Sequence, residues 1–324
     1  MTNPTFTIIA PNYNEAGSID EFYRRIKDTM DALDEPWELV WVDDGSVDDS
    51  TEKILELSRQ DSHVRPVIFA RNFGHQIAVT AGLDYSRGQA VVIMDSDLQD
   101  PPEVIPDLIA KWREGYEVVY AIRKEREGES WFKLMTASLF YRIIYRITDV
   151  NIPLDTGDFR LMDRKVVNVL NRMRERHRFL RGMSAWVGFR QVGVYYKRAA
   201  RYSGETKYPI KKMVKFASDA VTSFSYFPLQ VATYLGFISA GLSILAIPIV
   251  VLFRLVGSNA FFGQATTLIA VLFLGGVQLI SLGILGEYIG RLYDEAKHRP
   301  LYIVREAPKL ENNNYPGENN QNEN

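Results

Sequence analysis

The stretch AVVIMDSDLQDPP, residues 90–102, decides the fold. Its first five residues are apolar and rich in β-branched side chains, which predicts a short buried strand at Ala90–Met94. Two aspartates, Asp95 and Asp97, follow at once. Paired carboxylates at the end of a buried strand suit a hard cation such as Mg²⁺ or Mn²⁺. Acidic loops are common, however, so the pair alone is also consistent with a plain surface turn.

The segments around this stretch alternate between apolar strands and amphipathic helices. The other predicted strands are Thr5–Ala10, Leu39–Val42, Val64–Ala70 and Val118–Ala121. The predicted helices between them are Ile19–Leu33, Ser50–Arg59, Gln76–Tyr85 and Val104–Arg113. Strands that are apolar on both faces and separated by helices indicate βαβ units. The sequence therefore predicts an α/β fold with a mostly parallel sheet that is covered on both faces.

A polar cluster follows each of the first four predicted strands. The clusters are Asn12–Glu15, Asp43–Ser46, Arg71–Gly74 and Asp95–Asp97. Ligands of open α/β sheets bind beyond the carboxyl ends of the strands, so we expect the four clusters to line one cleft. Each cluster taken alone is also consistent with a turn or a helix cap.

Composition narrows the classes of protein that the chain can belong to. The 324 residues exceed one typical domain and carry a net charge of only −2, which gives no indication of a nucleic-acid partner. The chain has no cysteine, which excludes a disulfide framework and a thiolate-bound metal. Any metal must therefore be held by carboxylates, amides, water or one of the four histidines.

Two long apolar segments, Val231–Val256 and Thr266–Ile289, follow the predicted sheet. Each is long enough, at about 1.5 Å rise per residue, to cross a hydrocarbon core of about 30 Å. The alternative is a pair of buried core helices, although such helices rarely exceed ~20 residues without a polar face. The link between the segments has no lysine or arginine, whereas the outer flanks are basic. We therefore predict an integral membrane protein whose sheet-containing domain and both termini are cytoplasmic.

Two further segments are predicted to lie in the membrane interface. Trp131–Ile147 has apolar residues at helical spacing with basic residues between them, and Pro209–Phe227 combines three lysines with aromatic residues. The alternative for the first segment is an ordinary helix that packs between domains. Glycines of the apolar segments, such as Gly236 and Gly276, would also allow close packing between subunits, which favours a homo-oligomer.

Two polar segments lie between the predicted sheet and the apolar helices. Asp155–Arg160 follows the first amphipathic segment and is also consistent with a surface loop that holds an Asp–Arg pair. Farther on, Arg198, Arg201 and Lys207 surround Ser203–Thr206. Several cations beside a glycine suit phosphate recognition, and a basic patch on a membrane surface is the competing interpretation.

Six strings occur in order between Thr5 and Tyr208. They are Pro11–Glu15 (PNYNE), Val42–Ser46 (VDDGS), Arg71–Gly74 (RNFG), Asp95–Pro102 (DSDLQDPP), Asp158–Arg160 (DFR) and Gly204–Tyr208 (GETKY). As a set they resemble the family-2 glycosyltransferases with a GT-A fold, and among these the polyprenyl-phosphate glycosyltransferases. The pair of apolar segments is similar to the bactoprenol glucosyltransferase branch, whereas some of the related dolichyl-phosphate mannose synthases lack it.

The resemblance implies a role for each matching residue. Asp97 and Gln99 would ligate Mg²⁺ or Mn²⁺, and Asp95 would contact the ribose or the diphosphate of the donor. Asp158 would lie at the reacting centre and, with Asp97, count as catalytic. The nucleoside would be held by Pro11, Tyr13, Glu15 and Asp44, and the acceptor phosphate by Arg123, Lys133, Arg201 and Lys207. Thr206 stands where family members often have serine, which keeps the hydroxyl.

The implied reaction is transfer of a hexose, glucose from UDP-glucose, to undecaprenyl or another polyprenyl phosphate of a bacterial inner membrane. It would be a metal-dependent single displacement that inverts the anomeric carbon. A phosphate monoester has a second pKa of about 6 and is mostly ionised at neutral pH, so Asp158 is expected to position the acceptor rather than deprotonate it. Three alternatives stay open: a GDP-mannose-using synthase, a processive polysaccharide synthase and a non-catalytic membrane scaffold. The chain lacks the Gln-x-x-Arg-Trp string of the processive enzymes.

The chain is predicted to consist of four parts. Residues 1–128 would form the nucleotide-sugar-binding core, and residues 129–227 an acceptor region with the interfacial helices. Residues 228–290 would form the two transmembrane helices, and residues 291–324 a cytoplasmic tail that is partly disordered, because its end is rich in asparagine and glutamate.

Overall fold

The structure is a computed structural model of the chain, and it describes residues 4–124, 156–198, 225, 227–256 and 264–308. These residues form two compact units. One unit contains the sheet with its helices, and the other contains two long helices near the end of the chain. The segment Trp131–Ile147, nearly all of Pro209–Phe227 and the predicted boundary at residue 128 lie outside the described residues.

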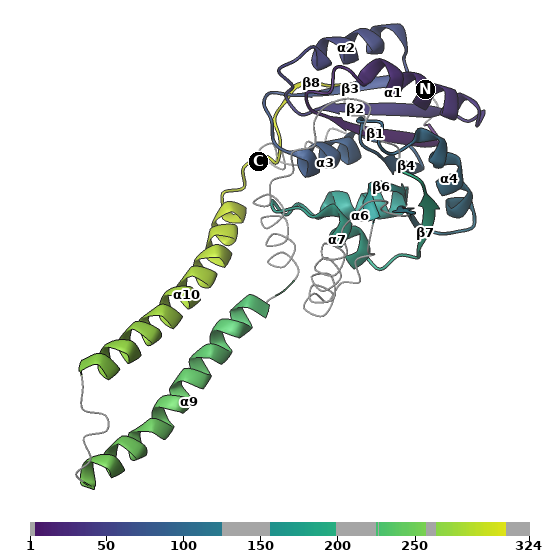
Figure 1. The fold of residues 1–324 in the computed structure, drawn as a ribbon. Coiled ribbons are helices and arrows are strands. Elements are labelled where there is room, and N and C mark those ends of the chain that lie inside the picture. Colours follow the sequence, from purple (N-terminus) through teal and green to yellow (C-terminus); the bar gives the residue numbers. More distant parts are fainter. Residues whose placement is uncertain (1–3, 125–155, 199–224, 226, 257–263, 309–324) are drawn as a thin grey trace, which may run out of the picture. The chain divides into compact units, whose positions relative to one another are not determined.

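The predicted parallel sheet is confirmed in the first part of the chain (Figure 1). Four strands pair in parallel in the order β3-β2-β1-β4. They are β1 (Phe6–Asn12), β2 (Trp37–Asp43), β3 (Val64–Phe69) and β4 (Ala90–Ile93), joined by α1 (Ile19–Asp31), α2 (Ser50–Gln60) and α3 (His75–Tyr85). All residues of β1 and β2 are buried, because helices cover both faces of the sheet.

The sheet continues beyond β4 with a different direction of pairing. A 3-10 turn η1 (Pro102–Val104) and α4 (Ile105–Arg113) lead into β5 (Val118–Arg123). β6 (Thr156–Asp163) runs antiparallel between β4 and β5, and β7 (Gln191–Tyr196) pairs in parallel with β5 at the sheet edge. Between β6 and β7 lie α6 (Arg164–Arg172) and α7 (Leu180–Trp186). The surface loop considered for Asp155–Arg160 is therefore wrong for Thr156–Arg160, which belong to a central strand.

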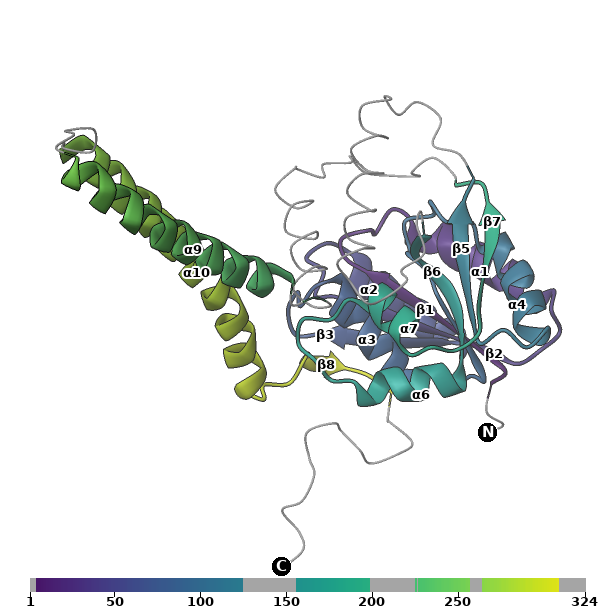
Figure 2. The same ribbon diagram turned by 90° about the horizontal axis from the view of Figure 1, so that it is seen from below.

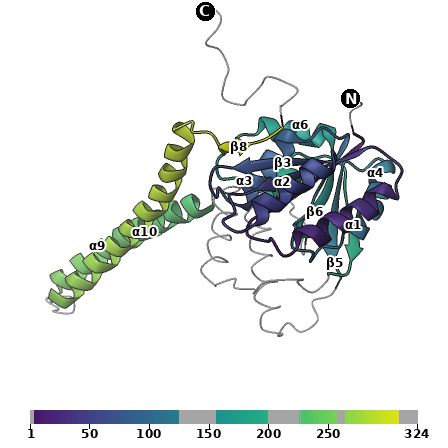
Figure 3. The same ribbon diagram turned by 90° about the horizontal axis from the view of Figure 1, so that it is seen from above.

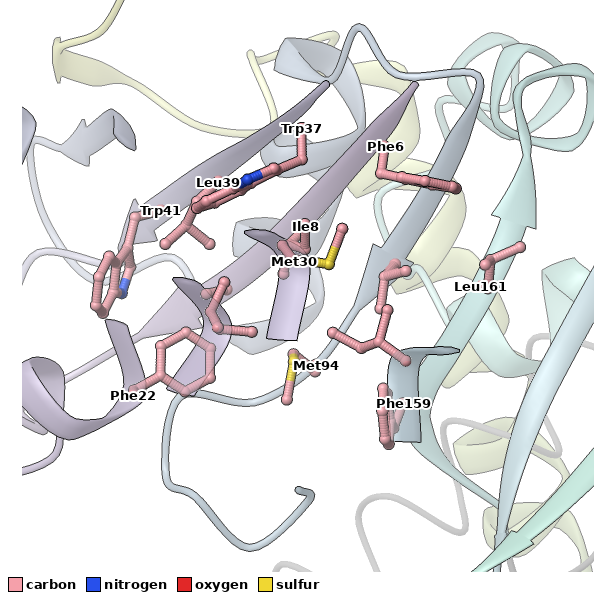
Figure 4. Packing of buried hydrophobic residues seen from close by; sticks show 14 of the residues in the cluster. Phe6, Ile8, Phe22, Met30, Trp37, Leu39, Trp41, Met94, Phe159 and Leu161 are labelled. Atoms are coloured by element: carbon pink, nitrogen blue, oxygen red, sulfur yellow. The ribbon is translucent and has the colours of Figure 1, made fainter. Parts of the chain in front are cut away.

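One face of the sheet packs on α1, α2 and α4 in a single hydrophobic core (Figure 4). Phe6 of β1 meets Trp112 edge to face, with the ring centroids 5.9 Å apart. Phe22 of α1 packs against Trp41 of β2 at 5.4 Å. Alternate residues of each strand reach this core, since successive side chains of a strand point to opposite faces.

The opposite face carries α3, which lies unusually close to β1. A Cβ atom on Gly82 of α3 would come within 2.2 Å of Cγ2 of Ile9, so only glycine allows this approach. α3 begins at the carboxyl end of β3, and close packing against β1 fixes where its first turn lies. The first turn of α3 is thereby placed beside the ends of the parallel strands.

The chain returns to the sheet after the last long helix. β8 (Val304–Glu306) pairs antiparallel with β3 and forms the edge of the sheet (Figure 3). Tyr302 precedes it, and its ring stacks on Phe69 with the centroids 5.2 Å apart. The Tyr302 hydroxyl donates to Asp84 Oδ2 at 2.8 Å. These residues belong to the segment that was predicted to be a tail, so the strand is a feature that was not predicted.

In its described residues, the second unit consists mainly of α9 (Phe227–Leu255) and α10 (Gln264–Ala296), which lie side by side (Figure 2). Their segments Phe227–Ala246 and Ile269–Ala296 have mean hydropathies of 1.6 and 2.2 and are long and apolar enough to cross a membrane. Their described apolar side chains are mostly exposed in the single chain. Length and composition thus fit the predicted pair of apolar helices.

Candidate active site

The carboxyl ends of β1 and β2 bring the first two polar clusters together. Asn12 pairs with Asp43 in the sheet register, and their side chains are 3.5 Å apart from Asn12 Nδ2 to Asp43 Oδ1. The backbone N–H of Asn14 donates to Ser46 Oγ at 2.9 Å. Asp43 also accepts from Thr51 Oγ1 at 2.5 Å, so its carboxylate serves to hold the two loops. Pro11 is buried in β1, whereas 46% of Tyr13 is exposed.

Asp44 joins the second cluster to the third. The backbone N–H groups of Phe73 and Gly74 donate to its two carboxylate oxygens at 2.6 and 2.9 Å. Burial raises the pKa of Asp44 even though both amides favour its ionised form. Gly74 has a φ of 102°, a conformation that favours glycine. The predicted nucleoside ligand Asp44 therefore also shapes the loop that begins α3.

The fourth cluster lies against the first. Ser96 Oγ donates to Pro11 O at 3.0 Å, which fixes the turn between the two aspartates. Asp97 Oδ1 accepts from the backbone N–H of Gln99 at 3.0 Å, so the two predicted metal ligands share one turn. Asp95 Oδ1 is buried with no hydrogen-bond partner, and burial raises the pKa of Asp95 to about 6. In the part of the chain that the structure describes, no group of three or more histidine or acidic side chains is arranged as a metal site.

Asp158 lies at the same end of the sheet, on β6, which pairs with β4. Arg181 Nε of α7 lies 2.8 Å from Asp158 Oδ1, and His75 Nε2 lies 3.2 Å from Asp158 Oδ2. Gln76 Nε2 is 3.4 Å from Oδ2. Burial opposes ionisation of this carboxyl, but Arg181 and His75 outweigh it and hold the pKa of Asp158 well below its usual range. Both oxygens of Asp158 therefore face donors and positive charge.

Sequence reasoning missed His75, Gln76 and Arg181. His75 and Gln76 directly follow the Arg71–Gly74 string, so their place after a strand-end cluster was a usable signal. Arg181 stands in a segment rich in arginine, where nothing in the spacing separates it from its neighbours. Only the packing of α7 on β6 reveals its partner.

Arg123 ends β5 and is linked to a second buried acid, Asp100, through a tyrosine hydroxyl. Arg123 Nε donates to the Tyr196 hydroxyl at 3.3 Å, and that hydroxyl donates to Asp100. Arg198 Nε lies 3.4 Å from Asp100 Oδ1. A Cβ on Gly157 would come within 2.9 Å of Arg123 Nη2, which places Arg123 beside the residue before Asp158.

The structure thus brings together most of the predicted site residues that it describes. Asp44 contacts the loop that starts α3, while Asp95, Asp158 and His75 face one another. Glu15 lies beside Ser50 through its backbone N–H, at 3.2 Å. Three predicted acceptor residues, Lys133, Arg201 and Lys207, lie outside the described residues.

Comparison with known proteins gives the family. Residues 7–170 match the family described as Glycosyl transferase family 2. An uncharacterized glycosyltransferase of Bacillus subtilis, YkcC, is 50% identical over 95% of each chain. A bactoprenol glucosyl transferase of Shigella phage SfV is 42% identical over 92% of this chain and 97% of its own length.

Solved structures are more distant in sequence. A mannosyltransferase of Pyrobaculum calidifontis, in complex with GDP-Man and Mn²⁺, is 18% identical and covers 89% of this chain and 88% of its own, with a TM-score of 0.44. A glucosyl-3-phosphoglycerate synthase of Mycobacterium tuberculosis, in complex with Mn²⁺, UDP and glucosyl-3-phosphoglycerate, is 20% identical over 68% of this chain and 78% of its own, with a TM-score of 0.43. On the match over residues 7–170 and the identity to relatives along nearly its whole length, the chain belongs to glycosyl transferase family 2 and is a glycosyltransferase.

Proposed function

We propose that this glycosyltransferase moves a hexose, glucose from UDP-glucose, to undecaprenyl or another polyprenyl phosphate. The observation that carries the proposal is the 42% identity to a bactoprenol glucosyl transferase over 92% of the chain, including both apolar helices. A lipid acceptor explains why a nucleotide-sugar enzyme would carry two helices long enough to cross a membrane. The product would be a lipid-linked monosaccharide for cell-envelope or protein glycosylation.

The donor half of the cleft would be built by the ends of the parallel strands. Pro11, Tyr13, Glu15 and Asp44 are proposed to hold the nucleoside, with Asp95 at the ribose or diphosphate. Asp97 and Gln99 offer only oxygen ligands on one turn, a donor set that suits Mg²⁺ or Mn²⁺. When bound, the cation would offset charge on the departing diphosphate.

Asp158 is proposed to orient the acceptor rather than to deprotonate it. Arg181 and His75 already occupy its oxygens, and its lowered pKa makes it a weak base. A phosphate acceptor is mostly ionised at neutral pH, since its second pKa is about 6, so little base catalysis is needed. The reaction would be a single displacement with inversion at the anomeric carbon.

The acceptor half of the site would consist of basic side chains that bind the acceptor phosphate at the membrane surface. Arg123 is proposed to bind the acceptor phosphate with Lys133, Arg201 and Lys207. Moving a polyprenyl tail out of the bilayer costs a large free energy, because each CH₂ buried in the bilayer contributes about 0.8 kcal/mol. The catalytic domain is therefore proposed to work at the membrane surface. This surface is proposed to be the cytoplasmic face, with both termini on that side. The chain is also proposed to assemble into a homo-oligomer.

Transfer assays would test this function directly. The full chain in detergent or vesicles is incubated with radiolabelled UDP-glucose or GDP-mannose and with undecaprenyl phosphate. A lipid-linked monosaccharide from UDP-glucose supports the proposal, and one from GDP-mannose shifts it to a mannose synthase. A polymer would indicate a processive synthase, and no product with any nucleotide-sugar would contradict transfer to a lipid phosphate.

A further inference from the structure

His75 lies where the donor half and the acceptor half of the cleft meet. It is the first residue of α3 and follows Gly74, whose N–H is bound to Asp44 at 2.9 Å. Its side chain extends to Asp158 of β6, and 41% of it is exposed. The backbone next to His75 is therefore held by Asp44, which is proposed to bind the donor. The side chain of His75 contacts Asp158, which is proposed to orient the acceptor.

The ring faces two carboxylates but hydrogen-bonds to one. His75 Nε2 is 3.2 Å from Asp158 Oδ2, within hydrogen-bond range, and 3.6 Å from Asp95 Oδ1, beyond it. Asp95 Oδ1 is buried and has no hydrogen-bond partner. Because one N–H donates well to only one acceptor, His75 hydrogen-bonds to Asp158. Asp95 interacts with the ring through its charge alone.

Charge explains why a histidine suits this position. Asp95 and Asp158 come from the neighbouring strands β4 and β6, and two carboxylates that close repel each other. His75 stands between them, while Arg181 supports Asp158 from α7 and Asp44 faces the ring from the end of β2. Burial lowers the pKa of His75, but Asp95 and Asp158 outweigh this and raise it above its usual range.

We propose that His75 is a positioning residue for the transfer reaction: by its hydrogen bond it fixes the orientation of the Asp158 carboxylate beside Asp95. The inference rests on the proposed function, because it assumes that Asp158 orients the acceptor. His75 touches neither substrate in this role. It acts through Asp158, so losing it should slow turnover more than it weakens donor binding.

Two substitutions of His75 separate the effect of its hydrogen bond to Asp158 from the effect of its charge. His75→Met removes the donor, and His75→Gln keeps a neutral N–H at a similar reach. We expect His75→Met to lower kcat about tenfold or more, as for loss of a hydrogen bond to a charged group, with a smaller change in the donor KM. His75→Gln should retain more of kcat than His75→Met. His63→Gln is the matched control: His63 contacts Asp61 at 2.6 Å just before β3, at the opposite end of the sheet, and its loss should leave kcat unchanged.

A double-mutant cycle tests whether His75 works through Asp158. Single-turnover assays with radiolabelled donor compare His75→Met in the wild-type background with His75→Met in Asp158→Asn. A loss in the first background that disappears in the second supports the inference. An equal loss in both backgrounds overturns it, and so does an unchanged kcat in His75→Met and His75→Gln together.

The melting temperature of each variant shows whether a loss of kcat comes from a loss of stability. Variants that melt like the wild type and lose kcat support positioning, whereas a lower kcat that follows the melting temperature in both variants contradicts it. The wild-type chain is assayed first with undecaprenyl phosphate. If it transfers no sugar, the proposed function fails; if it transfers sugar and the His75 variants match it, only the inference about His75 fails.

Discussion

Arg181 and Asp158 form an ion pair with 2.8 Å between Arg181 Nε and Asp158 Oδ1, and only 13% of the Asp158 side chain is exposed. The carboxylate belongs to β6 and the guanidinium to α7. A carboxylate that is mostly buried would otherwise favour its protonated form. The pair, with His75 on the other oxygen, keeps Asp158 ionised.

We expect Arg181→Met to move the acid limb of the pH–activity profile to higher pH. In the wild type the pKa of Asp158 is depressed, so ionised Asp158 is lost only as the pH falls far below the usual carboxyl range. Without Arg181 this pKa rises, and activity falls earlier as the pH is lowered. Profiles of kcat/KM from about pH 3 to about pH 8 measure the shift. Arg181→Lys keeps the charge and should move the limb less; identical profiles for all three proteins would rule the assignment out.

We expect metal removal to abolish transfer. Asp97 and Gln99 share one turn and offer oxygen ligands, so a hard divalent cation is the expected partner. EDTA should stop sugar transfer, and Mg²⁺ or Mn²⁺ should restore it. Asp97→Asn should reduce turnover by about a hundredfold or more while the melting temperature changes little. Full activity in the chelator would remove the metal from the mechanism.

We expect Tyr302→Ala to destabilise the catalytic unit by about 1–3 kcal/mol. Tyr302 stacks on Phe69 and donates to Asp84 at 2.8 Å, so it joins the segment after α10 to the edge of the sheet. Tyr302→Phe keeps the stacking and should lose only about 1 kcal/mol. Thermal unfolding provides the comparison, with Tyr195→Ala as an exposed control. Equal melting temperatures for all of these proteins would show that the returning segment contributes nothing to stability.

The first half of the sheet could be predicted because its strands are apolar on both faces and α1 and α2 are amphipathic. β6 could not, since it carries Asp158 and Arg160, which make it resemble a polar loop. Arg160 is buried and satisfied by Ser184 and by Gly157 O at 3.0 Å, and only tertiary packing supplies such partners. β8 was missed for a related reason: a three-residue strand has no periodicity to recognise.

The grouping of the strand-end clusters followed from the sequence, whereas the partners of Asp158 did not. A parallel sheet puts the residues after its strands at one edge, so Asp44 and Asp95 could be grouped from order alone. Arg181 comes from α7, and His75 enters through the start of α3. Their meeting at Asp158 depends on how closely the helices pack, for which Gly82 against Ile9 is one determinant.

We expect an impermeant label applied outside sealed cells to reach only the link between the two long helices. That link, residues 258–262, has no lysine or arginine, whereas the outer flanks are basic. Single cysteines placed at Asn259 and at Asn313 give matched probes, because the natural chain has no cysteine. Labelling of position 259 alone supports cytoplasmic termini. Labelling of position 313 from outside would reverse the orientation.

We expect Arg123→Met to raise the KM for polyprenyl phosphate about tenfold or more, with UDP binding nearly unchanged, because it removes a cation proposed to bind the acceptor phosphate. Arg123 donates to Tyr196 at 3.3 Å and lies beside Gly157, the residue before Asp158. Arg190→Met is the matched control, since Arg190 lies over the Tyr116 ring at 5.1 Å, at the far end of β7. Initial rates over a range of acceptor concentrations, together with calorimetric titration of UDP, separate the two halves of the cleft. Arg201→Met, made in parallel, should follow Arg123→Met. If Arg123→Met instead weakened UDP binding and left the acceptor KM unchanged, Arg123 would belong to the donor half, and the division of the cleft would have to be redrawn around β5.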